Sequence, residues 1–169
     1  KGGTVKLMLD VARRRQLTIN HTSIHLINLS ARKVLGEHVW QAGSSKTPEK
    51  AHLDITHYKT ITEEETLEIE KNANELIQKS IKVKKELLPK DEAEKRYGMR
   101  LYQGGAVPGR EIRVVSIADL EHEACGGTHL DNTRDAGRII ILNTERIQDG
   151  IDRITIKSGH VAEKYLDYS

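Results

Sequence analysis

Apolar residues recur at helical spacing in two long stretches of the chain. The first covers residues 20–35, where Asn20 stands at the N-cap position and Gly36 follows the last apolar residue. Asparagine often caps helix N-termini and glycine often ends helices, so this pattern predicts a helix from Asn20 to Leu35. The second stretch, residues 61–80, starts with a capping box and carries one apolar stripe. Thr62 and Glu65 form the capping box, and the apolar stripe consists of Ile69, Ala73, Leu76 and Ile77.

Alternating and β-branched runs predict strands in six further segments. The segments are residues 39–44, 51–58, 81–88, 111–117, 137–147 and 151–159. In the second of them, Leu53, Ile55 and His57 fall on one face. Pro89 opens a predicted short helix, and Ser158 is expected to cap a last one. Because the strands follow one another without regular crossover helices, we expect an α+β fold, with a mixed or antiparallel sheet packed with helices.

The composition limits the possible class of protein. With 169 residues, 37% of them hydrophobic and 31% charged, the chain is expected to form a single globular domain over residues 1–169. No apolar run reaches the ~20 residues of a membrane helix, so no membrane partner is expected. The net charge of +2 neither requires nor forbids a nucleic-acid partner. Because the chain does not begin with Met, we expect a fragment excised from a longer protein.

Two histidines on the first predicted helix are candidate metal ligands. His21 and His25 are four residues apart, which places both rings on one helix face. Asn28 and Arg32 continue this polar stripe, and apolar residues flank it on both sides. Such a stripe should be at least partly buried, and buried polar groups need partners. A metal ion is one partner that would satisfy both imidazoles.

The only cysteine lies in a glycine loop and repeats the four-residue spacing. Cys125 and His129 enclose Gly126, Gly127 and Thr128 in the segment CGGTH. A single cysteine excludes an internal disulfide and indicates a reducing compartment, here the cytoplasm, in which a thiolate can bind metal. The two pairs together supply three imidazoles and one thiolate, a tetrahedral set that favours Zn²⁺ over magnesium or calcium.

Other interpretations of these residues stay open. Histidines four apart are often ordinary helix residues, and His122, three residues before the cysteine, is the strongest rival ligand. His52, His57 and His160 are further substitutes. Four protein ligands usually mark a structural zinc, whereas catalytic zinc keeps one position open. The ligands are nevertheless scattered along the chain, and one lies where backbone N–H groups can approach a substrate. Either one ligand is labile, or the metal orients a substrate without being its only activator.

At these residues the chain resembles the editing domain of alanyl-tRNA synthetase in its archaeal form. The matching motifs are HTSIH (residues 21–25) and the distant CGGTH (residues 125–129), with further agreement over residues 32–44, 52–58 and 141–154. One departure is Ser23-Ile24, where the family more often has Ala-Thr; neither is a ligand position. The resemblance implies the α+β fold shared by the threonyl- and alanyl-tRNA synthetase editing modules.

The resemblance also implies a reaction, which is hydrolysis of the ester that joins serine or glycine to the 3′ end of tRNA(Ala). The N–H groups of Gly126 and Gly127 would stabilise the oxyanion. Gln41 would sense the serine hydroxyl, and Thr22 and Thr128 would line the pocket. The partners would be the charged acceptor end and the remainder of the parent synthetase. The expected phosphate contacts are Arg13, Arg14, Arg15 and Arg32.

Three rival functions remain at this point. One is a free-standing editing protein of the same superfamily, with unchanged chemistry. Another is the threonyl-tRNA synthetase module, although the GGT filling of the CxxxH motif favours the alanine system. The third is a structural zinc module that binds RNA without catalysis, for which the basic run at residues 13–15 would be a solvated or RNA-binding face.

Overall fold

The computed structural model describes residues 2–168 and forms an α+β fold, as the sequence predicts. The helices are α1 (Val11–Leu35), α2 (Glu63–Gln78), α3 (Lys90–Tyr97) and α4 (His160–Asp167), with short 3₁₀ turns η1 (Met99–Tyr102) and η2 (Thr133–Ala136). The strands are β1 (Gln41–Lys46), β2 (Ala51–Thr56), β3 (Val83–Pro89), β4 (Glu111–Ile117), β5 (Glu121–Ala124), β6 (Ile139–Gln148) and β7 (Ile151–Ser158). Among these residues, no helix combines the length and apolar character needed to cross a membrane.

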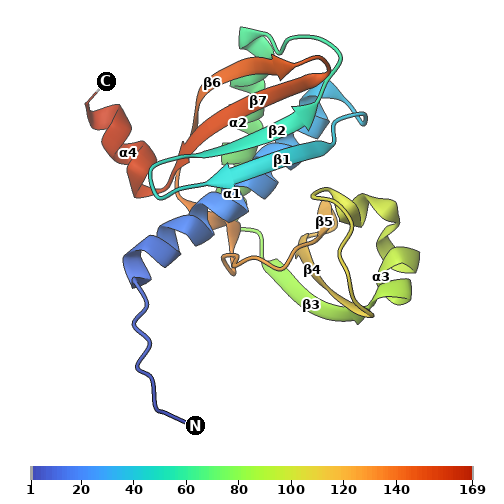
Figure 1. Cartoon of the computed structure of the whole chain (residues 1–169). Coiled ribbons are helices and arrows are strands. Elements are labelled where there is room, and N and C mark those ends of the chain that lie inside the picture. The colour runs from blue at the N-terminus through green and yellow to red at the C-terminus, as the bar shows by residue number, and fades with distance from the viewer. Residues whose placement is uncertain (1, 169) are drawn as a thin grey trace.

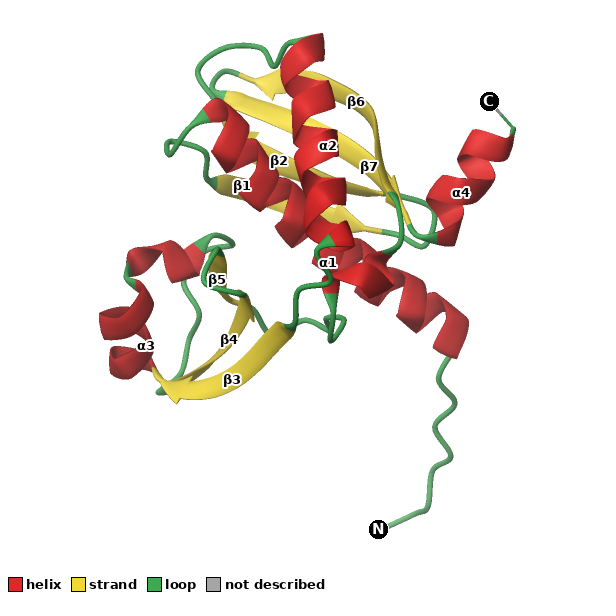
Figure 2. Cartoon of the chain, turned by 180° about the vertical axis from the view of Figure 1, so that it is seen from behind, coloured by secondary structure: helices red, strands yellow, loops and turns green. Residues whose placement is uncertain are grey.

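The larger sheet carries the main hydrophobic core. Its strands lie in the order β1-β2-β7-β6, and every neighbouring pair is antiparallel. Helices α1 and α2 pack side by side across one face of this sheet (Figure 2). Alternation explains the packing, because Leu53 and Ile55 of β2 and Ile154 and Ile156 of β7 all point into this layer and are fully buried. His57 shares the face of Leu53 and Ile55, as predicted, and is also buried.

A second, smaller sheet positions the glycine loop. Strands β3-β4-β5 pair antiparallel, and α3 lies beside them, apart from the larger sheet (Figure 1). The main core continues into this sheet through Val83, Val115 and Ile117. Strand β5 ends at Ala124, so the chain leaves the sheet at Cys125, whose N–H still donates to the carbonyl of Arg113. The loop from residue 125 onward is thereby directed at α1.

The start of α1 corrects one prediction. The helix begins at Val11 and not at Asn20, because Asp10 is the N-cap and accepts a hydrogen bond from the Arg13 N–H. Residues 11–19 are mostly good helix formers, so nothing in their propensity ends the helix earlier. The Asn20 side chain instead bonds the carbonyl of Thr47 and accepts from Ser158. The other end is as predicted, since Gly36 terminates α1 with φ of +116°.

The second half of the chain gives two more corrections. Ser158 does not cap α4: the N-cap is Gly159, without a side-chain bond, because the Ser158 hydroxyl is used by α1. Strand β5 was not predicted, since the segment is short and polar. In contrast, the capping box of Thr62 and Glu65 is confirmed at the start of α2, and its predicted apolar stripe is buried.

Candidate metal centre

The fold brings together the four side chains that the sequence singled out. His21 and His25 come from the middle of α1, and Cys125 and His129 come from the loop after β5. The Cys125 Sγ lies 3.4 Å from His21 Nε2 and 3.3 Å from His129 Nε2. One potential ligand atom from each of the four residues lies within 4.8 Å of all the others. Residues about a hundred positions apart therefore form one cluster.

Two sulfur–nitrogen distances in the cluster match those of a tetrahedral zinc site. Zinc–ligand bonds of ~2.0–2.3 Å place the donor atoms ~3.3–3.7 Å apart, and the two sulfur–nitrogen distances fall in this range. The ring centroids of His21 and His129 are 4.1 Å apart, and those of His25 and His129 are 4.5 Å apart. His25 and His129 are buried, whereas His21 and Cys125 are partly exposed. The residues present fit a divalent soft metal, with one side open to solvent.

Each imidazole has an oxygen-bearing neighbour, and two of the three rings are hydrogen-bonded to it. The His129 Nδ1 lies 3.3 Å from the Thr22 hydroxyl, and the His21 ring bonds the backbone of Thr128. The His25 Nδ1 lies 3.3 Å from the Glu123 carboxylate. Such contacts fix the tautomer and the orientation of metal-binding histidines. The other ring nitrogens remain free to face the cluster.

The protonation state of the cluster also suits metal binding. Burial, with the charge of Lys46, lowers the pKa of His21 to about 4, and burial lowers the pKa of His129 as well. Burial raises the pKa of Cys125, but the neighbouring His25 and the Gly127 N–H offset this, and the pKa lies below its ordinary value. Zinc requires neutral imidazoles and a thiolate, and the pKa shifts of His21, His129 and Cys125 all favour those forms.

We expect the metal-free chain to lose stability on mild acidification. The unfolded chain protonates His21 below pH 6.5, whereas the folded chain protonates it only near pH 4. The unfolded state therefore binds more protons in this window, and stability falls as the pH falls through it. Between pH 7 and pH 5, His21 alone should remove about 1–2 kcal/mol from the free energy of unfolding, measured by urea titration. The variant His21→Gln should show a smaller pH dependence; an equal dependence would contradict the assignment.

The two glycines of the loop play different parts. A Cβ on Gly127 would lie 2.1 Å from His21 Cε1, so this position must lack a side chain for the ring to pack there. A Cβ on Gly126 would meet nothing within 4 Å. Arg113 Nη1 donates to the carbonyls of Cys125 and Gly127, which fixes the loop orientation. The Gly127 N–H bonds the cysteine sulfur, whereas Gly126 is exposed beside the cluster.

The residues expected to bind substrate occupy distinct environments. Gln41 begins β1, and its backbone N–H donates to Gln103 Oε1 at 3.1 Å. Thr22 is fully buried and bonds both His129 and the Leu130 N–H. It therefore supports a ligand rather than lining an open pocket. Thr128 is exposed and bonds the Thr18 hydroxyl.

The expected phosphate contacts divide into two groups. Arg13, Arg14 and Arg15 are exposed on the first turns of α1, and the first two line a hollow of about 230 Å³ with Thr128. Arg32 is 8% exposed, and its guanidinium is paired with Glu121 inside the protein. The geometry therefore does not favour a tRNA contact by Arg32.

Three charged residues at the cluster were not predicted from the sequence. Lys46 lies on β1, where it donates to Ser44 and acts electrostatically on His21 and Cys125. Arg113 holds the glycine loop, and Glu123 approaches His25. Glu123 could have been found from the sequence, because the alternation in EHEA (residues 121–124) places both acids on one strand face.

Two of the rival histidines, His122 and His57, make other contacts. His122 stacks on Tyr97 and bonds the Ser116 hydroxyl, and His57 bonds His38.

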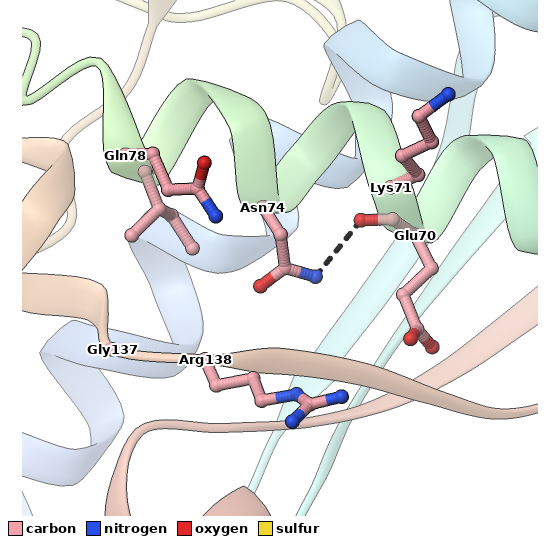
Figure 3. A pocket seen from close by; sticks show the side chains of 7 residues that line it. Glu70, Lys71, Asn74, Gln78, Gly137 and Arg138 are labelled. Atoms are coloured by element: carbon pink, nitrogen blue, oxygen red, sulfur yellow. Dashed lines mark hydrogen bonds between the residues drawn. The ribbon is translucent and has the colours of Figure 1, made fainter.

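A separate hollow of about 470 Å³ lies between α2 and the start of β6, and none of the four cluster residues lines it (Figure 3). There, Asn74 bonds the Glu70 carbonyl and the β6 backbone, so its amide is committed to packing.

Known proteins resemble this chain along nearly all of its length. Residues 112–155 match the family described as the threonyl and alanyl tRNA synthetase second additional domain. The chain is 51% identical over 162 residues to an alanine–tRNA ligase of Methanopyrus kandleri, which covers 96% of the chain and 18% of that protein. It is 52% identical over 166 residues to the alanine–tRNA ligase of Thermococcus kodakarensis, covering 98% of the chain and 18% of the relative.

These matches place the chain within much longer relatives. It spans about 18% of the length of both ligases, and the matched family segment extends from β4 into β7, with the CGGTH loop inside it. The expected resemblance is thereby confirmed. Over nearly its whole length the chain is similar to a segment of these archaeal alanine–tRNA ligases, and its residues 112–155 match the threonyl and alanyl tRNA synthetase second additional domain.

Proposed function

We propose that this chain is a zinc-dependent editing domain that hydrolyses seryl- and glycyl-tRNA(Ala). The observation that carries the proposal is the meeting of His21, His25, Cys125 and His129 beside an exposed glycine loop, in a chain similar to alanine–tRNA ligases. The proposed partners are the charged acceptor end of tRNA(Ala) and the remainder of a synthetase.

Physical limits on selection give such a domain its purpose. A pocket built for the alanine methyl group rejects serine or glycine by only ~1–3 kcal/mol, because the side chains differ by so little. A second, hydrolytic site corrects the resulting errors. A site that bonds the serine hydroxyl discriminates strongly against alanine, since alanine would leave the site's polar group unpaired.

The proposed mechanism is direct attack of water on the ester carbonyl. Zinc bound at the cluster would polarise a water or hold the amino acid and terminal ribose. The exposed Gly126 N–H is the better oxyanion donor of the two glycines, because that of Gly127 bonds the cysteine sulfur. Gln41 is proposed to bond the serine hydroxyl. Arg13 and Arg14, which line the hollow next to Thr128, are proposed to bind phosphates of the acceptor end.

One observation favours a second candidate function. The cluster offers four protein ligands, which is the usual number at a structural zinc. A chain with such a centre and exposed arginines at residues 13–15 would bind RNA without catalysis. The two functions differ in whether the ester is cleaved.

The deciding experiment is a deacylation assay with the purified chain. We expect one zinc per chain and hydrolysis of seryl- and glycyl-tRNA(Ala) at least tenfold faster than hydrolysis of alanyl-tRNA(Ala). Removal of the metal by a chelator should abolish the difference, and added zinc should restore it. A zinc-loaded, folded chain that binds tRNA and hydrolyses none of the three esters would establish the binding module instead.

A further inference from the structure

A buried acidic pair lies beneath the metal cluster. Glu121 and Glu123 of β5 are 3% and 4% exposed, and both face α1. They meet the polar stripe of that helix, which continues from His25 through Asn28 to Arg32. Carboxylates are rarely buried unless they are paired and hydrogen-bonded, because their desolvation is costly. Each of these acids therefore needs an identifiable partner.

The two acids share a hydrogen bond with each other, and their remaining partners differ. Arg32 Nη2 pairs with Glu121 Oε2. Both oxygens of Glu123 lie near nitrogens: Oε1 accepts from Asn28 Nδ2 at 3.1 Å, and Oε2 lies 3.3 Å from His25 Nδ1. The buried His25 Nδ1 makes no hydrogen bond of normal geometry in the described part of the chain, and the Glu123 carboxylate is the acidic group that approaches it.

We propose that Glu123 is a positioning residue that holds His25 in the tautomer able to bind metal. This inference rests on the metal centre of the proposed function. A neutral imidazole carries one proton, and the hydrogen bond made by one nitrogen decides which nitrogen carries it. With the proton on Nδ1, 3.3 Å from Glu123 Oε2, the lone pair of Nε2 is left for the cluster. Loss of this acceptor would allow the ring to rotate or to place its proton on the ligating nitrogen.

The same network reaches the residue proposed to select serine. Asn28 Nδ2 also lies 3.4 Å from Gln103 Oε1, which accepts from the Gln41 backbone N–H. If residue 123 were changed to a donor, Asn28 could turn its amide to accept from it only by losing its hydrogen bond to Gln103. Glutamine at position 123 would offer one acceptor where the neighbours present two donors. The isosteric substitution is thus expected to be disruptive although it preserves volume.

The test compares two glutamine substitutions on the same strand. Zinc affinity is measured for Glu123→Gln and Glu121→Gln by competition with a chelator, together with the absorption spectrum of the cobalt-substituted chain. Both variants remove one buried acid, but only the first faces a proposed ligand. Loss of a residue that orients a ligand typically weakens metal binding 10–100-fold, and this is the effect expected of Glu123→Gln. We expect Glu121→Gln to bind zinc within threefold of the unchanged chain, with an unaltered cobalt spectrum.

Two results would overturn the proposal. One is a folded Glu123→Gln chain with unchanged zinc affinity and cobalt spectrum; the other is an equal loss of affinity in both variants. Nitrogen-15 NMR of the unsubstituted, metal-free chain gives a further test that does not depend on variant folding. The proton of His25 should reside on Nδ1, and its presence on Nε2 would refute the positioning role. If the chain bound no zinc, the proposed function would fail, whereas this measurement would still decide how Glu123 acts on His25.

Discussion

Replacing Cys125 by alanine should reduce hydrolysis of seryl-tRNA(Ala) at least a hundredfold. The sulfur lies within 3.4 Å of two imidazole nitrogens and is the only thiolate the chain can supply. Structural zinc sites bind with ~10–16 kcal/mol, so one of four ligands accounts for about 3 kcal/mol, or more than a hundredfold in affinity. The expected result is a chain without bound zinc and without deacylase activity, measured by metal analysis and ester hydrolysis.

The matched control for this substitution is His122→Ala. His122 lies three residues before the cysteine, but its ring bonds Ser116 and stacks on Tyr97 outside the cluster. Its loss should leave the zinc content at one per chain and the activity within threefold. Circular dichroism must show that the Cys125→Ala chain is folded. A folded Cys125→Ala chain with full activity would remove the chemical basis of the proposal.

The candidate site was more predictable than its surroundings, for a physical reason. Helical geometry alone places His21 and His25 on one face, and the loop motif supplies Cys125 and His129 at the same spacing. Ligand type and number then predict the metal without knowledge of the fold. The structure adds that the two pairs meet, which spacing within each pair could not show.

Buried polar residues account for most of what the sequence did not predict. The inward positions of β5 are Glu121 and Glu123, so a search for alternating apolar residues finds no strand there. Their burial makes sense only beside Asn28 and Arg32, about ninety residues earlier in the chain. Gln103 is likewise 1% exposed inside a turn-rich loop, because it bonds the start of β1. Local patterns carry no information on partners that distant.

The start of α1 was predicted too late in the chain because the first turns of the helix are exposed and have no apolar pattern. Residues 11–19 are compatible with a helix, but three of them are consecutive arginines that give no apolar stripe. Asp10 was a recognisable cap. Because the helix is longer than predicted, Arg13, Arg14 and Arg15 lie on the same helix as His21 and His25. This single helix therefore connects the proposed phosphate contacts to the metal centre.

Substituting Gly127 by alanine should destroy the metal centre without touching any ligand. The added Cβ would lie 2.1 Å from His21 Cε1 and 2.4 Å from its Nδ1, far closer than ordinary contacts of ~3.4–4 Å. The loop cannot easily yield, because Arg113 bonds the carbonyls of Cys125 and Gly127. The ring of His21 must therefore leave its position. We expect zinc affinity to fall at least thirtyfold, deacylation at least a hundredfold, and stability by about 1–3 kcal/mol.

The same substitution at the neighbouring Gly126 is the control that distinguishes the steric clash with His21 from a general effect on the loop. A Cβ on Gly126 would have no atom within 4 Å, and its backbone does not lie in the left-handed region. Gly126→Ala should therefore keep zinc affinity within threefold and the free energy of unfolding within about 0.5 kcal/mol. Calorimetric zinc titration and urea unfolding of the two variants measure this contrast. Equal zinc affinity in both would mean that the His21 ring can leave its place beside Gly127 without loss of metal, and His21 would then no longer count as a ligand.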